Sequence, residues 1–477
     1  MHSAIDTDND DCTANDFVGY NEWAQQELDV KIATDFVYEV EGDERGVFIA
    51  EDIGPHTEVF SIPLASLLTV DAACRDPVLG ELAFFQQSCA DTEDDQLAVA
   101  LLYEKWVRRD DSRWRNHITL LPKAYHNVLY FPEDALTHLH GSNLYLIAKQ
   151  MTEKVASDYA RLQDDVLAPL FDAVADRASA EELQEWFSLS KYKWALSTIW
   201  SRFVSLRVTP PNGSQSGNES EDDEERGGPF FGMQRVKAMI PVFDMLNHDP
   251  EAEMSHYLDV ATQKFKLVSH QHWSAGAQMY INYGALSNHK LLALYGFVIP
   301  NNPYDALDLW VSMDEASCSY YHEKTALLSA NGLDHATTPF ELTADELNEL
   351  LLITVRIEEI ECDSVEQLEV LAAKALDGEV LSFDNEHMTL TRLIYTLQKM
   401  LDEFDGTLED DDAKLREWAA QEGELSDETG DDGEDNNKKQ SDVYERMAVI
   451  VRRSDKLILK ETIDMLKWKL LEILPTS

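Results

Sequence analysis

Hydrophobic positions follow two different periods along this chain. Alternation at every second position is typical of strands separated by turns, and it marks the runs 36–40, 46–50 and 58–63. Helical spacing of apolar residues then predicts helices over 95–108, 144–175 and 180–206. Strand-like runs return within 238–305. The pattern predicts a β-rich region, about 30–95 and 230–305, interrupted by a helical insertion over 96–208.

From residue 306 the pattern becomes mainly helical. The expected helices cover 322–330, 343–359, 365–375, 388–404 and 441–474. Two acidic stretches, 209–229 and 406–440, carry few large apolar side chains and are expected to be disordered loops. The predicted domains are an N-terminal polar segment and helix at 1–29, an α+β domain at 30–305 and an all-α lobe at 306–477.

Charge and cysteine usage exclude several classes of function. The chain of 477 residues carries 39 Lys and Arg against 90 Asp and Glu, a formal charge of −51. Such a balance argues against direct nucleic-acid binding and suits a basic protein partner. The five cysteines form no CxxC pair, so neither a zinc cluster nor a disulfide framework is expected. We expect an intracellular protein, cytoplasmic or nuclear, with no signal peptide and no membrane span.

Candidate chemistry concentrates within 238–305. Asp244, Asn247 and His248 follow an apolar run, and Tyr283 follows on a later strand-like segment. A Tyr-Gly-Phe triplet at 295–297 comes next. Polar groups beside a buried segment need hydrogen-bond partners, either in the protein or in a ligand.

Taken together and in this order, these motifs resemble the SET-domain protein methyltransferases. The resemblance is strongest to the branch of the Rubisco large-subunit lysine methyltransferase and the actin-histidine methyltransferase. It implies an α+β fold: a β-rich, pseudoknotted SET core with a helical insertion, followed by an all-α substrate-binding lobe. It also implies S-adenosylmethionine as cofactor and a protein as substrate, and a monomer is expected.

The same resemblance assigns roles to individual residues. Tyr283 matches the catalytic position, and Arg202 matches the arginine that holds the cofactor's carboxylate, a task suited to a planar guanidinium. The other implied cofactor-binding residues are Glu58, Phe60, Asp244, Asn247, His248 and Phe297. The residues implied for the substrate channel are Phe203, Phe243 and Tyr295.

The branch contains both lysine and histidine methyltransferases, and three residues favour lysine. Phe203 follows Arg202 where the histidine enzyme has an Asn, and Phe243 stands where that enzyme has a Trp. Tyr295 stands where it has a Ser. A long apolar stem suits an aromatic channel, whereas a histidine acceptor needs a polar partner for its second ring nitrogen. The sequence therefore predicts lysine N-methylation, with histidine N-methylation as the alternative.

Two other readings stay open at this point. Asp244, His248 and His256 could form a metal site, although the prolines around them disfavour the helix that would align them, and no metal is predicted. The chain could also be a catalytically silent scaffold that keeps the fold and binds partners through its helical lobe. The presence of Tyr283 and Arg202 favours an enzyme.

Overall fold

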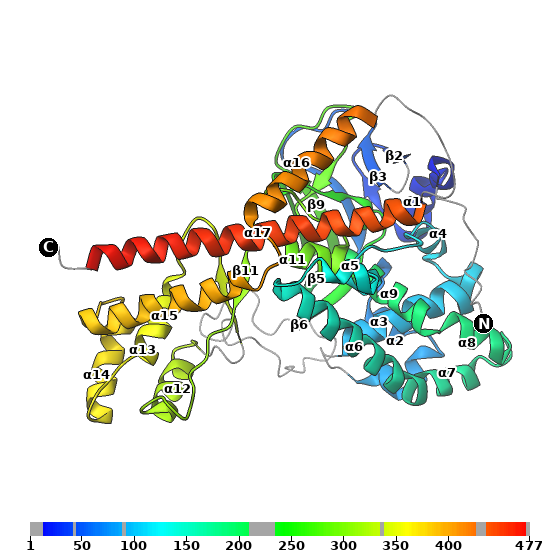
Figure 1. Ribbon diagram of the computed structural model, residues 1–477. Coiled ribbons are helices and arrows are strands. Elements are labelled where there is room, and N and C mark those ends of the chain that lie inside the picture. Colours follow the sequence, from blue (N-terminus) through cyan, green and yellow to red (C-terminus); the bar gives the residue numbers. More distant parts are fainter. Residues whose placement is uncertain are drawn as a thin grey trace. The chain divides into compact units, whose positions relative to one another are not determined.

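The computed structural model describes residues 13–41, 44–87, 92–208, 234–333, 338–425 and 436–473. The chain forms two compact units (Figure 1). The first unit comprises 1–125 and 152–285, and the second comprises 126–151 and 286–477. The predicted acidic loop at 209–229 lies outside the described residues. Across the described ranges, none of the helices combines the length and the apolar character that a bilayer crossing requires.

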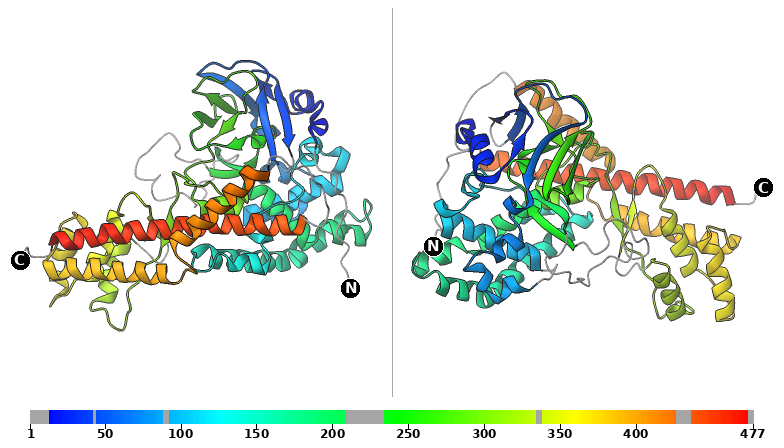
Figure 2. Two further views of the ribbon diagram at one scale, coloured as in Figure 1. Left: turned by 45° about the horizontal axis from the view of Figure 1, so that its top comes forward. Right: turned by 180° about the vertical axis from the view of Figure 1, so that it is seen from behind.

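The central sheet of the first unit joins strands from both ends of that unit. Its order is β1-β4-β9-β8. The strands are β1 (Lys31–Ile32), β4 (Thr57–Pro63), β9 (Lys264–Ser269) and β8 (Met254–Asp259). All neighbours are antiparallel, and the blue and green strands lie side by side in Figure 2. Two sequence segments separated by about two hundred residues thus build one sheet.

Three strand pairs complete the β structure of this unit. The pairs are β2 (Phe36–Glu41) with β3 (Glu44–Ile49), β5 (Phe203–Val208) with β6 (Gln234–Met239), and β7 (Asn247–His248) with β10 (Tyr280–Ile281). The first two pairs are antiparallel, whereas β7 and β10 are parallel. Parallel pairing here sets Asn247 beside Tyr280 and His248 beside Ile281. The polar motif is therefore a strand of the core and not an external loop.

Helices of the first unit lie before the sheet, directly after β4 and in the predicted insertion. They are α1 (Tyr20–Leu28), α2 (Val70–Cys74), α3 (Glu93–Leu102), α4 (Arg115–Thr119), the C-terminal part of α6 (Asn143–Leu162), α7 (Ala168–Ala173), α8 (Ala180–Trp186) and α9 (Leu189–Arg202). The last helix ends earlier than predicted, because residues 203–208 form β5. These residues pair along their whole length with β6, which offsets any local helical preference.

The second unit is mainly helical. Its helices are α5 (Glu133–Thr137), the N-terminal part of α6, α11 (Asn288–Lys290), α12 (Tyr321–Ala330), α13 (Glu349–Glu358), α14 (Val365–Leu376), α15 (Phe383–Asp402), α16 (Leu408–Leu425) and α17 (Asn436–Ile473). A short pair, β11 (Leu307–Leu309) and β12 (Phe340–Leu342), completes it. Helices α15 and α17 run alongside each other (Figure 1) and share a buried core with α13.

A second core explains why residues 126–151 belong to this unit. Val128, Leu139 and Leu144 pack with Leu292 and with the first half of α17 around Ala448. All five are buried. The division between units thus differs from the predicted boundary at 305/306, since residues 286–305 share this core with α17.

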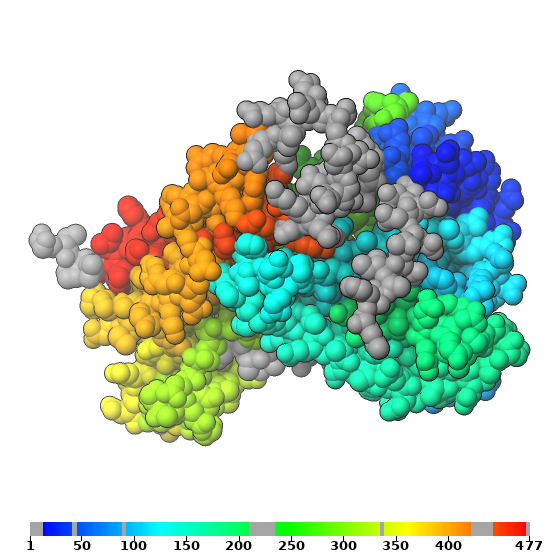
Figure 3. All heavy atoms as spheres, turned by 45° about the vertical axis from the view of Figure 1, so that its right-hand side comes forward, coloured from blue at the N-terminus to red at the C-terminus, as the bar shows by residue number. Residues whose placement is uncertain are grey.

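Helix α16 corrects the prediction of a disordered stretch over 406–440. Residues 408–425 and 436–440 are helical, and 426–435 lie outside the described residues. Asp411 of α16 is buried and forms ion pairs with Arg452 and Lys456 of α17, and Asp412 pairs with Arg453. In Figure 3 the orange surface of α16 lies against the red surface of α17. The acidic composition that suggested disorder is neutralised by basic residues of the neighbouring helix.

Candidate active site

Arg202 stands at the junction between α9 and β5. Phe203 adopts an extended backbone, so the helix ends at Arg202 and the strand starts at the next residue. The Arg202 side chain is 14% exposed, and its Nη1 donates to the carbonyl of Asp244 at 2.5 Å. Its Nε is buried and has no hydrogen-bond partner among the described residues. A buried guanidinium N–H without a partner is costly, which indicates that a ligand group completes this site.

Asp244, which lies beside Arg202, also has a buried atom that lacks a hydrogen-bond partner among the described residues. Its carboxylate is 1% exposed, and Oδ2 lies 3.0 Å from Nε2 of His117. The other oxygen, Oδ1, is 4.0 Å from Arg202 Nη1 and has no hydrogen-bond partner within the described part of the chain. Burial alone would lower the pKa of Arg202, but charge interactions with Tyr125 and Asp244 raise it above its ordinary value. The guanidinium is therefore a permanent positive charge in a buried setting.

The segment before Asp244 is held in a strained conformation. Val242 has φ 74°, which is a rare backbone angle for a β-branched residue. Its N–H donates to the hydroxyl of Tyr20 at 3.2 Å, and that hydroxyl also lies 2.8 Å from Nδ1 of His117. Tyr20, His117 and Asp244 thus form one buried hydrogen-bonded chain. Such strain persists where surrounding contacts fix it, and it often marks functional sites.

Asn247 and His248 form strand β7 directly after this segment. The Asn247 side chain donates from Nδ2 to the carbonyl of Arg45 at 2.5 Å, which ties β7 to β3. Gly46 follows Arg45, and a Cβ at Gly46 would lie 2.6 Å from the ring of Phe48. A side chain at position 46 would therefore require the Phe48 ring to move.

His248 and Tyr283 form a stacked pair. Their ring centroids are 4.9 Å apart with planes inclined by 19°. The Tyr283 N–H lies 3.2 Å from Nδ1 of His248, and the same Nδ1 lies 3.4 Å from the carbonyl oxygen of Ile281. Burial lowers the pKa of His248, which favours the neutral imidazole.

The Tyr283 hydroxyl is fixed by the main chain. It donates to the carbonyl of Leu246 at 2.7 Å, in the turn that links Asp244 to Asn247. Because the hydroxyl proton is used in this bond, the phenol oxygen retains its lone pairs as acceptors. An acceptor of this kind suits a polarised methyl group or an amine N–H.

Glu58, Phe60 and Phe243 lie in or against the central sheet. Strand β4 lies between β1 and β9, so Phe60 pairs in register with residues on both sides and its ring is 1% exposed. The Glu58 side chain forms an ion pair with Lys266 at 3.2 Å. Phe243 is buried against Phe60 and Phe265, with centroid distances of 6.4 and 4.8 Å. These contacts describe the side chains, and the predicted roles of the three residues in cofactor and substrate binding stay predictions.

A lysine side chain of the same chain covers one face of the Phe203 ring. The Lys237 Nζ stands 4.7 Å from the centre of the Phe203 ring. The same ammonium forms a 2.6 Å ion pair with Asp94. In this arrangement one face of Phe203 is covered by Lys237.

Tyr295 and Phe297 belong to the second unit. Their rings meet edge to face with centroids 6.1 Å apart, and burial raises the pKa of Tyr295. Gly296 between them has φ 83°, and a Cβ there would come within 2.8 Å of the backbone nitrogen of Asn127. The Tyr-Gly-Phe motif therefore requires glycine both for its backbone angle and for this close approach.

The three residues considered as a possible metal site make other contacts in the structure. Asp244 pairs with His117, His248 accepts from Tyr283, and His256 packs against Phe243 at a centroid distance of 5.3 Å. No cluster of three or more His, Cys, Asp or Glu residues suited to a metal occurs in the ranges that the structure describes.

Sequence reasoning missed Tyr20, His117 and the main chain of Arg45. His117 lies within the run 112–122, and nothing in its local spacing signals a contact with Asp244, which is 127 residues away. Only the structure shows that α4 buries His117 beside Ile118, and a buried polar side chain needs a hydrogen-bond partner.

Comparison with known proteins relates this chain to protein methyltransferases. Residues 315–459 match the Rubisco LSMT substrate-binding family. The actin-histidine N-methyltransferase of Drosophila melanogaster is 30% identical over 281 residues, which cover 57% of this chain and 48% of that protein. The human protein of the same name is 24% identical over 381 residues, or 78% of this chain and 58% of that protein. The chain thus spans about half the length of these curated relatives.

Solved structures establish the fold. The crystal structure of the SET domain of LSMT bound to MeLysine and AdoHcy superposes with a TM-score of 0.70 and 20% identity. The superposition covers 97% of this chain and 94% of that one. The predicted α+β class with a SET core and a helical C-terminal lobe is therefore confirmed, as is the resemblance to this methyltransferase branch.

Proposed function

We propose that this protein transfers a methyl group from S-adenosylmethionine to a side-chain nitrogen of a protein substrate. The observation that carries the proposal is a pair of buried atoms, Arg202 Nε and Asp244 Oδ1, that have no hydrogen-bond partner in the described part of the chain and lie beside the turn that accepts a hydrogen bond from Tyr283. The fold shared with the LSMT structures and the match to the Rubisco LSMT substrate-binding family support it.

The residues present fit the amino-acid end of such a cofactor. Arg202 offers a buried, permanently charged guanidinium to a carboxylate, and its Nε still needs an acceptor. Asp244 Oδ1 needs a donor, which an ammonium group supplies. Strands β7 and β3, joined by the hydrogen bond from Asn247 Nδ2 to the Arg45 carbonyl, bring further main-chain polar groups together.

When bound, S-adenosylmethionine supplies a sulfonium-activated methyl group. Because this methyl group would pass directly to a neutral acceptor nitrogen, the residues of the chain would mainly position the two reactants. The Tyr283 hydroxyl donates a hydrogen bond to the carbonyl of Leu246, so the lone pairs of its oxygen are held at a fixed place as acceptors. Tyr is neutral at physiological pH, so we assign it a positioning and electrostatic role at the reacting centre.

For the acceptor we propose lysine. The LSMT structures contain MeLysine with AdoHcy, and Tyr295 keeps the aromatic residue that distinguishes this chain from the histidine enzyme. Phe203 and Phe243, the other two residues that favour lysine in the sequence, contact Lys237 and Phe265 respectively, and their place in the substrate channel stays a prediction. Histidine is the second candidate, favoured by the names of the curated relatives.

Calorimetric titration of the purified protein with S-adenosylmethionine tests the cofactor proposal. We expect saturable binding to one site per chain. If circular dichroism shows a folded protein that does not bind S-adenosylmethionine, the proposed function is excluded. If the protein binds the cofactor but methylates no protein in a cell extract, the result would support the hypothesis of a catalytically silent scaffold.

A further inference from the structure

Tryptophan rings and basic side chains pack together in one part of the first unit. Trp106 lies in the π-helical turn Tyr103–Arg108 that follows α3, and its ring stacks on Trp186 of α8, with centroids 6.2 Å apart and planes inclined by 12°. Lys105 Nζ lies 5.4 Å from the centre of the Trp106 ring and 4.6 Å from that of Trp194 in α9. The half-buried Lys105 side chain thus places its nitrogen over two indole rings.

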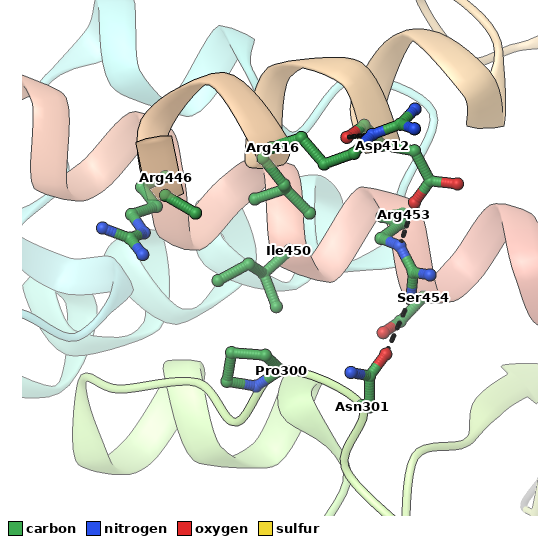
Figure 4. A pocket seen from close by; sticks show the side chains of 10 residues that line it. Pro300, Asn301, Asp412, Arg416, Arg446, Ile450, Arg453 and Ser454 are labelled. Carbon is green, nitrogen blue, oxygen red and sulfur yellow. Dashed lines mark hydrogen bonds and ion pairs between the residues drawn. The ribbon is translucent and has the colours of Figure 1, made fainter. Parts of the chain in front are cut away.

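Lys105 lacks the carboxylate partner that other half-buried cations of this chain have. In the second unit, for example, Arg453 pairs with Asp412 at 2.5 Å (Figure 4). Within the described ranges Lys105 forms no ion pair of this kind, and its nitrogen lies over the two indole rings. An ammonium group that leaves water without a counter-charge is costly, so this setting favours the neutral amine.

The charges around Lys105 act in the same direction. Burial, together with the charges of Lys191 and Lys123, lowers the pKa of Lys105 to about 8. Near neutral pH a part of this side chain is therefore an uncharged amine, which is a nucleophile. An exposed lysine, with a reference pKa of about 10.4, is almost fully protonated at the same pH.

The indole N–H of Trp106 is a buried donor without an acceptor. Its Nε1 has no hydrogen-bond partner among the described residues, whereas Nε1 of Trp194 donates to the Pro122 carbonyl at 2.8 Å. Lys191 Nζ lies 5.5 Å from the centre of the same Trp106 ring, so a cation stands beside this donor. A buried donor without a partner is costly, which indicates that a group from outside the chain accepts this hydrogen bond.

We propose that Lys105 is a site of reversible carbamylation by dissolved carbon dioxide, and that the Trp106 indole N–H and the Lys191 ammonium hold the carbamate. The neutral Nζ attacks the carbon of carbon dioxide and forms an N–C bond. One C–O π electron pair moves to oxygen, and a proton leaves Nζ for water. The charges of Lys191 and Lys123, which repel an ammonium at Lys105, attract the resulting anion. Carbon dioxide is small and uncharged, so a half-buried amine is accessible to it.

Chemical trapping locates the carbamate and does not depend on methyl transfer. The full chain would be equilibrated with isotope-labelled carbon dioxide and bicarbonate, treated with triethyloxonium to convert carbamates into stable ethyl esters, and digested for tandem mass spectrometry. We expect the labelled ester on Lys105 and none on exposed lysines such as Lys154 and Lys467, which serve as internal controls. A native chain that stays unmodified at Lys105 under saturating carbon dioxide would overturn the proposal.

Two tryptophan variants test how the carbamate is held. W106F keeps an aromatic ring and removes the N–H donor, so the carbon dioxide concentration for half-maximal trapping should rise by about tenfold or more. W194F makes the same exchange at the other ring beside Lys105, whose N–H already donates to Pro122, and should be trapped like the native chain. Circular dichroism would check that both variants are folded. Native trapping in W106F, or an equal loss in both variants, would refute the assigned role of the Trp106 N–H.

Discussion

His117 Nε2 lies 3.0 Å from Asp244 Oδ2, although 127 residues separate the two in sequence. Both side chains are at most 3% exposed. The contact links α4, in the helical insertion, to the strained turn that precedes Asn247 and His248. The insertion thereby takes part in positioning the carboxylate that faces Arg202.

Replacing His117 with Leu should leave the Asp244 carboxylate buried without its partner. We expect the free energy of unfolding to fall by about 2–3 kcal/mol and the affinity for S-adenosylmethionine to fall as well. Thr119→Ala, at an exposed position of the same helix, should change neither quantity noticeably. Denaturant unfolding and calorimetry measure the two effects, and a His117→Leu variant with native affinity would remove His117 from the positioning chain.

Arg202→Lys keeps the positive charge but loses the planar guanidinium and its Nε donor. Cofactor affinity should fall by about tenfold or more, because lysine cannot pair a carboxylate through two parallel hydrogen bonds. Arg207→Lys, further along β5, makes the same exchange away from Asp244 and should bind cofactor normally. If both variants bind alike, the carboxylate-binding role of Arg202 is wrong.

Tyr283→Phe removes the hydroxyl that donates to Leu246 and little else. Turnover should drop sharply, while cofactor affinity should stay nearly unchanged, because the lost interaction acts at the reacting centre. Tyr280→Phe is the matched control, since the Tyr280 hydroxyl donates to the side chain of Gln278, two residues earlier in the sequence. Native turnover in Tyr283→Phe would show that the hydroxyl has no role in the reaction.

The second unit should show a pH-dependent stability that depends on His289. Its Nε2 lies 2.8 Å from Asp455 Oδ1; burial alone would lower the pKa of His289, but the charge of Asp455 raises it above its ordinary value. A raised folded-state pKa stabilises the folded protein fully below about pH 6.5, and this contribution is lost as pH rises through the folded value. The stability difference between the native chain and His289→Gln should therefore shrink from acidic to alkaline pH.

Exposed His322 provides the control for that experiment. Its side chain is 82% exposed, so His322→Gln should change stability little at any pH. Urea unfolding at several pH values measures both variants. A difference for His289→Gln that grows with pH would contradict the predicted sign.

Local patterns predicted much of this structure and missed the distant contacts. Asp244, Asn247 and His248 are adjacent in sequence, so their grouping needed no tertiary information, and Tyr283 was placed by its motif. His117 and Tyr20 reach the site only because α1 and α4 pack beside the Asp244 turn, which no local spacing encodes. Contacts between elements that are far apart in sequence could not be predicted from local patterns.

Composition misled the prediction at α16. Its acidic residues suggested disorder, yet Asp411 is buried between Arg452 and Lys456 of α17. For Phe243 the structure adds a contact with Phe265 that the sequence did not predict, and its place in the substrate channel stays a prediction. Both outcomes depend on which element packs against which.

Transfer of a labelled methyl group tests the proposed reaction most directly. Cell-extract proteins would be incubated with the enzyme and methyl-labelled S-adenosylmethionine, and the products would be hydrolysed and analysed by mass spectrometry. We expect label in methyl-lysine with the native chain and a sharply reduced signal with Tyr283→Phe. Label in methyl-histidine alone would contradict the lysine assignment, and the absence of protein-bound label would contradict the proposed reaction itself.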